Sequence, residues 1–326
     1  MPMLRTSIKT FEIMALLVLP SIVSSQASRS AEVSVLYAGS LAAVMENGIG
    51  PDFAKATGDQ YRGEAQGSMG AARMIRDGLR QPDIFISADP LVNQTILMGT
   101  ANGNHVKWFM TLASSQLVLA YNPRSRFASK FQDAQGGKIP WYQALATQGV
   151  RFGRGDPSID PKGYRTLFMF RLAADFYHRP ELVKLIGDPM NPDQVLPEIV
   201  LLARLESGQF DAAIFYKHEA VAHRLPFISL PSEINLGDPH LASLYAKESY
   251  VTPKGEEVHG APIIFTITIP DTVKNVEAAL AFASFVLSSN QLWEQYGFGN
   301  VPHQVGGERA EVPSSLRKYD EGSFRP

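Results

Sequence analysis

Two Gly-Ser pairs have the residue types and positions that could hold a small anion. Gly39-Ser40 ends an apolar run, and Gly67-Ser68 opens a helical pattern. Each pair predicts a turn into a helix, which offers backbone N–H groups, a hydroxyl and the positive end of the helix dipole. Glycine beside serine lets a ligand approach the backbone closely. These groups suit an oxyanion; the alternative is that both serines only cap their helices, as serine often does.

A third motif, Asp160-Pro161, also marks the start of a helix. Asp is favoured at the N-cap and Pro at the first helical position. Lys162 and Arg165 then place positive charge in the first turn, where the helix dipole favours negative residues. An anion docked at this turn would explain both cations; the alternative is an ordinary capped helix on the surface.

Two other patterns resemble catalytic motifs but lack a required feature. His218 and His223 resemble the zinc motif H-E-x-x-H, but they stand five residues apart. On a helix this spacing turns the second ring about 140° away from the first, so the two do not share a metal. Residues 66–70 surround Ser68 but lack the first glycine of the G-x-S-x-G motif. We therefore expect no enzyme, although a secreted hydrolase that uses Ser68 or Ser40 stays open as an alternative.

Apolar runs and amphipathic patterns alternate along the chain. The predicted strands are 33–37, 83–87, 116–121, 212–216 and 263–269. The predicted helices are 41–57, 69–79, 162–177, 197–207, 217–223 and 276–287. This alternation indicates an α/β protein with mainly parallel strands. In such sheets ligands bind beyond the carboxyl ends of the strands, where we place the two Gly-Ser pairs.

Length and composition narrow the function classes. A chain of 326 residues is long enough for about two domains. With 30 Lys and Arg against 32 Asp and Glu, the net charge is -2, and the chain lacks the basic excess of nucleic-acid-binding proteins. The sequence has no cysteine, which excludes disulfides, thiolate metal sites and a lipid-modified cysteine.

The first 27 residues follow the pattern of a cleaved signal peptide. Arg5 and Lys9 precede an apolar run, and Ser25-Gln26-Ala27 fits a small-x-small cleavage site. The run of about 11 residues is far shorter than the 20 or so that span a bilayer; the alternative is a buried N-terminal helix. We expect export to the periplasm without a lipid anchor.

Short segments in a fixed order resemble the periplasmic molybdate/tungstate-binding proteins, most of all their tungstate-type branch. The segments are AGSL (38–41), QGSMGAAR (66–73), DIFISADP (83–90), DPKGYR (160–165), ARLESGQFDAAIFYKHEAVAH (203–223) and LPSEINLGDP (230–239). The resemblance implies a two-lobed α/β periplasmic binding protein fold of type II, with the ligand cleft between the lobes. It also implies an ABC importer, whose membrane permease is the partner. We expect a signal peptide at 1–27, one lobe from 28–112 and 264–326, and the other from 113–263.

The resemblance also implies which residues bind the ligand. They are Gly39, Ser40, Ser68, Asp160, Pro161, Lys162, Glu198 and Tyr216. In this branch the Asp and Glu carboxylates are thought to bind the tungsten or molybdenum centre directly and make it six-coordinate. For Glu198 the alternative is an acidic residue in the first turn of a helix. We expect a monomer with no cofactor whose ligand is tungstate or molybdate; sulfate, phosphate and a small organic anion are the alternatives.

Overall fold

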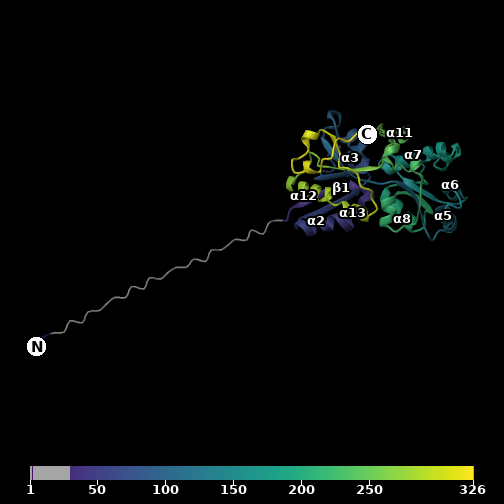
Figure 1. The fold of residues 1–326 in the computed structure, drawn as a ribbon, viewed down its shortest axis with the longest axis horizontal. Coiled ribbons are helices and arrows are strands. Elements are labelled where there is room, and N and C mark those ends of the chain that lie inside the picture. The colour runs from purple at the N-terminus through teal and green to yellow at the C-terminus, as the bar shows by residue number, and fades with distance from the viewer. Residues whose placement is uncertain (1, 3–29, 326) are drawn as a thin grey trace. The chain divides into compact units, whose positions relative to one another are not determined.

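The computed structural model describes residue 2 and residues 30–325 (Figure 1). The predicted signal peptide therefore lies, apart from residue 2, outside the described residues. The chain divides into two compact units after residue 30, and the fold is that of the second unit, which the structure describes over residues 31–325. Among the described helices, none has the length and apolar character needed to cross a bilayer.

One sheet has six strands in the order β13-β4-β12-β3-β1-β2. The strands are β1 (Glu32–Ala38), β2 (Gln60–Gln66), β3 (Ile84–Ser87), β4 (Trp108–Ser114), β12 (Ile264–Thr268) and β13 (Val305–Gly307). Its main helices are α2 (Gly50–Thr57), α3 (Ser68–Arg76) and α12 (Val276–Leu287). The rings of Phe53 on α2 and Phe282 on α12 meet edge to face at 5.0 Å, so these two helices share one apolar layer.

The other large sheet has five strands in the order β7-β6-β8-β5-β9. The strands are β5 (Leu117–Tyr121), β6 (Phe152–Gly155), β7 (Val195–Leu196), β8 (Ala212–Tyr216) and β9 (Phe227–Ser229). Its helices include α5 (Ala128–Gln135), α6 (Trp141–Leu145), α7 (Pro161–Phe176), α8 (Glu198–Glu206) and α9 (Lys217–Ala222). A separate hairpin pairs β10 (Ser249–Val251) with β11 (Glu257–His259).

Both large sheets are mixed, so the prediction of mainly parallel strands was wrong. β1 pairs in parallel with β2 and β3, and β6 with β7 and β8, whereas β12 and β5 run antiparallel to both of their neighbours. The reason lies in the connections between the sheets. β5 follows β4 after only residues 115–116, so the chain passes straight from the six-stranded sheet into the five-stranded one. β5 therefore runs away from the connection between the two sheets, whereas its neighbour β8 runs toward that connection. The two strands are antiparallel for this reason.

The helix predicted over 41–57 is interrupted in the structure. A 3-10 turn (Gly39–Leu41) leads into α1 (Ala42–Val44), a π-helical segment (Met45–Ile49) and then α2. Pro51 has no N–H with which to continue the regular bonding, and the turn before it widens so that the Gly50 N–H donates to the carbonyl of Met45.

Strands of the six-stranded sheet come from both ends of the described range, and those of the five-stranded sheet come from its middle. We propose that each sheet with its helices is one lobe. The boundaries near 112/113 and 263/264 stay a prediction. The direct connection between the two sheets, 115–116, is then one hinge segment, and 260–263, between the hairpin and β12, is the other.

Candidate functional site

Both Gly-Ser pairs lie where strands of the six-stranded sheet end. Gly39-Ser40 follows β1 in the 3-10 turn, and Ser68 is the first residue of α3, just after β2. Both serines are buried, and neither helix start has a side-chain capping hydrogen bond. The two serines are therefore not side-chain caps, which was the alternative to a binding role.

Each serine hydroxyl has a hydrogen to donate. Ser68 Oγ accepts the backbone N–H of Ala88 at 3.0 Å, so its own hydrogen is left for another acceptor. Ser40 Oγ is buried and has no hydrogen-bond partner among residues 30–325. Buried hydroxyls are almost always hydrogen-bonded in folded proteins. Both hydroxyls can therefore donate a hydrogen bond to a bound acceptor.

The start of α7 confirms the predicted capping motif. Asp160 is the N-cap, its Oδ1 accepts the Lys162 N–H at 2.9 Å, and Pro161 opens the helix. The second carboxylate oxygen, Oδ2, is buried without a hydrogen-bond partner in the described part of the chain. Burial raises the pKa of Asp160 well above its usual value, and the nearby carboxylate of Glu198 raises this pKa further. Asp160 Oδ2 is thus a second buried oxygen, beside Ser40 Oγ, that could contact a ligand.

The Asp160 segment packs directly on the second Gly-Ser pair. The carbonyl of Ile159 accepts the N–H groups of Met69 and Gly70 at 3.1 and 3.2 Å. A Cβ at Gly67 would lie 2.5 Å from the same carbonyl oxygen, so only glycine permits this approach. The start of α7, which carries Asp160, therefore meets the first turn of α3, which carries Ser68.

Lys162 is fully buried between two carboxylates. Its Nζ lies 2.6 Å from Glu198 Oε1 on α8 and 2.8 Å from Glu219 Oε1 on α9. Burial opposes the charged form, but the two carboxylates outweigh it and hold the pKa of Lys162 above its usual value. A Cβ at Gly39 would lie 2.5 Å from Glu198 Oε2, so this carboxylate also reaches the first Gly-Ser pair. Glu198 stands in the first turn of α8 and pairs with Lys162 at the same time.

Arg165 links residues that follow β3 of the six-stranded sheet to Tyr216 at the end of β8 of the five-stranded sheet. Its guanidinium donates to Asp89 Oδ2 at 2.8 Å, to the Ala88 carbonyl at 2.7 Å and to the Tyr216 hydroxyl at 2.8 Å. Tyr216, at the end of β8, is fully buried, and burial raises the pKa of its hydroxyl. Because that hydroxyl accepts from Arg165, its hydrogen is available to another acceptor.

Protein carboxylates thus lie beside both cations of the first turn of α7. This turn is buried, so it is not the surface helix considered as an alternative. Glu198, Glu219 and Asp89 explain Lys162 and Arg165 without an external anion. The predicted residues are connected by these contacts, but their binding of a ligand stays a prediction. In residues 30–325, no group of three or more His, Asp or Glu side chains could hold a metal ion by itself.

Asp89 and Glu219 belong to this network and were not predicted from the sequence. Asp89 caps the short helix α4 (Pro90–Val92), with its Oδ1 accepting the Leu91 N–H at 2.9 Å. Asp89-Pro90 repeats the Asp160-Pro161 pattern in the sequence, which was a usable signal. Glu219 lies inside the H-E-x-x-x-H pattern, and no feature of that pattern points to a partner at Lys162.

Burial also raises the pKa of Glu219, to about 7, with Lys162 opposing the rise and Glu198 adding to it. The folded protein therefore holds a proton between pH 4.5 and 7 that the unfolded chain has lost. We expect the free energy of unfolding to fall by roughly 3 kcal/mol as the pH rises through this range, and to level off above it. Denaturant unfolding at a series of pH values measures this slope. Glu219→Gln should flatten it; a slope unchanged in that variant contradicts the assignment.

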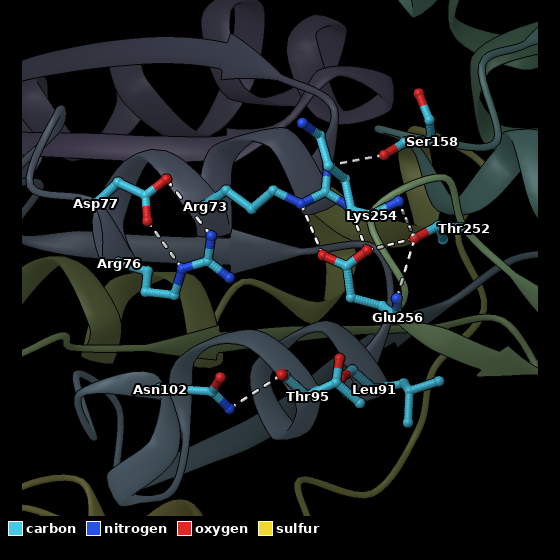
Figure 2. Close-up of polar contacts among 10 residues, drawn as sticks. All are labelled: Arg73, Arg76, Asp77, Leu91, Thr95, Asn102, Ser158, Thr252, Lys254 and Glu256. Carbon is cyan, nitrogen blue, oxygen red and sulfur yellow. Dashed lines mark hydrogen bonds and ion pairs between the residues drawn. The ribbon is translucent and has the colours of Figure 1, made fainter.

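A second ion pair joins α3, which carries Ser68, to the hairpin of β10 and β11, and the same arginine also reaches the segment before Asp160. Arg73, further along α3, donates to both carboxylate oxygens of Glu256 at 2.9 Å and to the Ser158 carbonyl at 2.8 Å (Figure 2). Glu256 lies next to β11 in the hairpin and also accepts from the Thr252 hydroxyl. Two N–H groups of the Arg73 guanidinium thus each donate to one oxygen of the Glu256 carboxylate. This bidentate geometry is the stronger form of an arginine–carboxylate pair.

We expect Arg73→Met to speed release of a bound anion about three- to tenfold, because its pair with Glu256 is only 12% and 13% exposed and its guanidinium also holds the Ser158 carbonyl, two residues before Asp160. Stopped-flow release of the anion measures this rate. The matched control is Arg76→Met on the same helix, whose pair with Asp77 is 34% and 50% exposed and joins neighbouring residues (Figure 2). Equal release rates in the two variants would contradict a role for Arg73 in retaining the anion.

The fold is the two-lobed α/β fold of periplasmic binding proteins. The periplasmic molybdate-binding protein of Azotobacter vinelandii superimposes with a TM-score of 0.57 at 16% identity, covering 83% of this chain and 100% of that one. The sulfate-binding protein SubI of Mycobacterium tuberculosis gives 0.51 at 15% identity, covering 90% and 94%. At these identities the likeness concerns the fold.

A family model described as bacterial extracellular solute-binding protein matches residues 33–299, and the chain belongs to this family. A putative ABC transporter molybdenum-binding protein of Haloferax volcanii is 38% identical over 277 residues, which cover 84% of each chain. The molybdate/tungstate-binding protein WtpA of Pyrococcus abyssi is 29% identical over 319 residues, covering 86% of this chain and 90% of that one.

Proposed function

We propose that this protein captures tungstate or molybdate and delivers it to the membrane permease of an ABC importer. The observation that carries the proposal is the pair of buried oxygens, Ser40 Oγ and Asp160 Oδ2, that have no hydrogen-bond partner within the described residues. They come from opposite sheets. An anion bound there would accept from the Ser40 hydroxyl, and the hydroxyls of Ser68 and Tyr216 can also donate to it. Asp160 Oδ2 would bond its central atom, so that the ligand holds the two sheets together.

A tetrahedral dianion needs donors rather than a matching cation. Neutral hydroxyl and N–H groups at helix starts stabilise such an anion. Lys162, already paired with two carboxylates, offsets part of the negative charge around the site. We therefore assign the binding role to the residues predicted from the sequence: Gly39, Ser40, Ser68, Asp160, Pro161, Lys162, Glu198 and Tyr216.

Calorimetric titration with tungstate, molybdate, sulfate and phosphate tests the proposal. We expect one anion per chain and no catalytic turnover. A ligand at 100 times its Kd also stabilises the fold by roughly 2.7 kcal/mol, so thermal unfolding gives an independent readout. Absence of binding to tungstate and molybdate at micromolar concentrations would overturn the proposal, and tighter binding of sulfate would support the alternative solute.

Asp160 and Glu198 are proposed to discriminate between anions. A carboxylate 4 Å from another charge of the same sign costs about 1 kcal/mol even in bulk water. The arrangement is favourable only if the carboxylate oxygens bond the central atom, and tungsten and molybdenum can take six ligands whereas sulfur in sulfate cannot. For sulfate the carboxylates are repulsive, which favours the rarer anion.

We expect Asp160→Asn to weaken tungstate binding about tenfold and to reduce the preference over sulfate, because it removes a charged ligand and a repulsive charge at once. Asparagine can still cap α7 through its Oδ1, so the helix start is retained. Competition calorimetry gives the ratio of the two affinities. X-ray absorption of the tungstate complex is the second test, and a shell of four oxygens without longer carboxylate contacts would refute direct coordination.

We also propose that the protein is exported to the periplasm, acts as a monomer and carries no lipid anchor. The family membership supports a place outside the cytoplasm. N-terminal sequencing of the protein recovered from the periplasmic fraction is expected to begin near Ser28. A chain that keeps its first 27 residues would contradict the proposed cleavage.

A further inference from the structure

His218 lies behind the turn that carries Ser40. It is the second residue of α9, and its side chain is buried. Its Nε2 is 3.1 Å from the carbonyl oxygen of Ser40, and its Nδ1 is 2.9 Å from Ser115 Oγ. A carbonyl oxygen can only accept, so Nε2 carries the hydrogen, and Nδ1 of the neutral ring accepts from the Ser115 hydroxyl. One tautomer therefore satisfies both contacts.

Aromatic rings hold the imidazole in this orientation. Phe298 stacks on it with ring centres 3.9 Å apart, Tyr216 lies nearly parallel at 5.5 Å, and Phe265 meets it edge to face at 5.3 Å. Burial keeps the pKa of His218 well below its usual value, so the ring stays neutral. The direction of the Nε2–H bond is thus set by packing.

The imidazole connects three parts of the molecule. Ser40 follows β1 of the six-stranded sheet, Ser115 lies in the connection between the sheets, and His218 itself follows β8 of the five-stranded sheet. Tyr216, which stacks on the ring, also accepts from Arg165, and Arg165 donates to the carbonyl of Ala88. The ring is therefore in contact with a binding serine, a hinge segment and a binding tyrosine.

We propose that His218 is a positioning residue for oxyanion binding: its Nε2–H holds the Ser40 peptide so that the Ser40 hydroxyl faces the anion. The inference rests on the proposed function. Ser40 lies in the short 3-10 turn (Gly39–Leu41), and the Nε2–H of His218 donates to its carbonyl, so this bond fixes the orientation of the Ser40 peptide and of the hydroxyl that it carries. Without that bond the hydroxyl turns away from the site, and a buried carbonyl is left unpaired.

Two substitutions separate the donor from the packing. His218→Phe keeps an aromatic ring against Phe298 but removes the N–H, whereas His218→Gln loses the ring and keeps an N–H donor. In titrations with sodium tungstate, we expect the Phe variant to raise Kd about tenfold or more and the Gln variant to recover most of the affinity. His223→Phe, at the residue that follows the same helix and outside the site, should leave Kd unchanged. Thermal unfolding without anion identifies any variant that fails to fold.

A double-mutant cycle tests whether His218 acts through Ser40. If it does, His218→Phe adds little to the loss already caused by Ser40→Ala, while it exerts its full effect in a Ser68→Ala background. The same factor in both backgrounds, or a Gln variant no better than the Phe variant, would overturn the inference. Wild-type protein that binds tungstate, together with a Phe variant of equal affinity, defeats this inference alone. Wild-type protein that binds neither tungstate nor molybdate defeats the proposed function as well.

Discussion

Lys162→Met is expected to lower the free energy of unfolding by about 3–5 kcal/mol, since removing one partner of a buried ion pair leaves an uncompensated charge. Lys162 is 0% exposed, and its ammonium is the group that lies between the Glu198 and Glu219 carboxylates. Without it, two acidic groups remain close together away from water. Denaturant unfolding near pH 8, above the raised pKa of Glu219, gives the largest effect.

The control for this prediction is Lys138→Met. Lys138 pairs with Asp133 at 2.9 Å, but the lysine side chain is 74% exposed, so its loss should change stability by at most about 1 kcal/mol. Adding Glu219→Gln to Lys162→Met should restore part of the lost stability, because it removes one of the two uncompensated carboxylates. Equal small losses from Lys162→Met and Lys138→Met would show that the buried cluster does not depend on its cation.

Ser40→Ala and Ser68→Ala should each raise the Kd for tungstate about ten- to hundredfold, because a hydrogen bond to a charged group contributes about 1.5–3 kcal/mol. Both hydroxyls are buried at strand ends, and each retains a hydrogen to donate. Ser40→Ala should hardly alter the stability of the anion-free protein, since its hydroxyl has no hydrogen-bond partner in the described chain. Isothermal titration of each variant measures the loss.

Ser232→Ala is the matched control for the serines. Like Ser68, Ser232 is the first residue of a helix, α10 (Ser232–Asn235), but it is exposed and its hydroxyl reaches only Glu233. Its replacement should leave tungstate affinity unchanged. If Ser40→Ala and Ser68→Ala also bind with wild-type affinity while remaining folded, the two serines take no part in ligand binding.

Local sequence determined the elements that carry the site. Asp160-Pro161 predicts the start of α7 because the capping oxygen and the proline ring act within three residues of each other. The apolar run before Gly39-Ser40 predicts β1. The glycine predicts a close approach of the ligand to the backbone, and the structure places the Glu198 carboxylate there. Short-range bonding and periodicity are written in neighbouring residues, so these features are readable without a structure.

The ion-pair partners of the site residues and the directions of the strands were decided only by the tertiary structure. Lys162 meets Glu198 and Glu219, which lie 36 and 57 residues further along the chain, because the starts of α7, α8 and α9 converge where strands end. No local pattern distinguishes a cation that awaits a ligand from one that is paired with distant carboxylates. The antiparallel direction of β5 likewise follows from the short connection after β4, and a strand's own apolar pattern is the same in either direction.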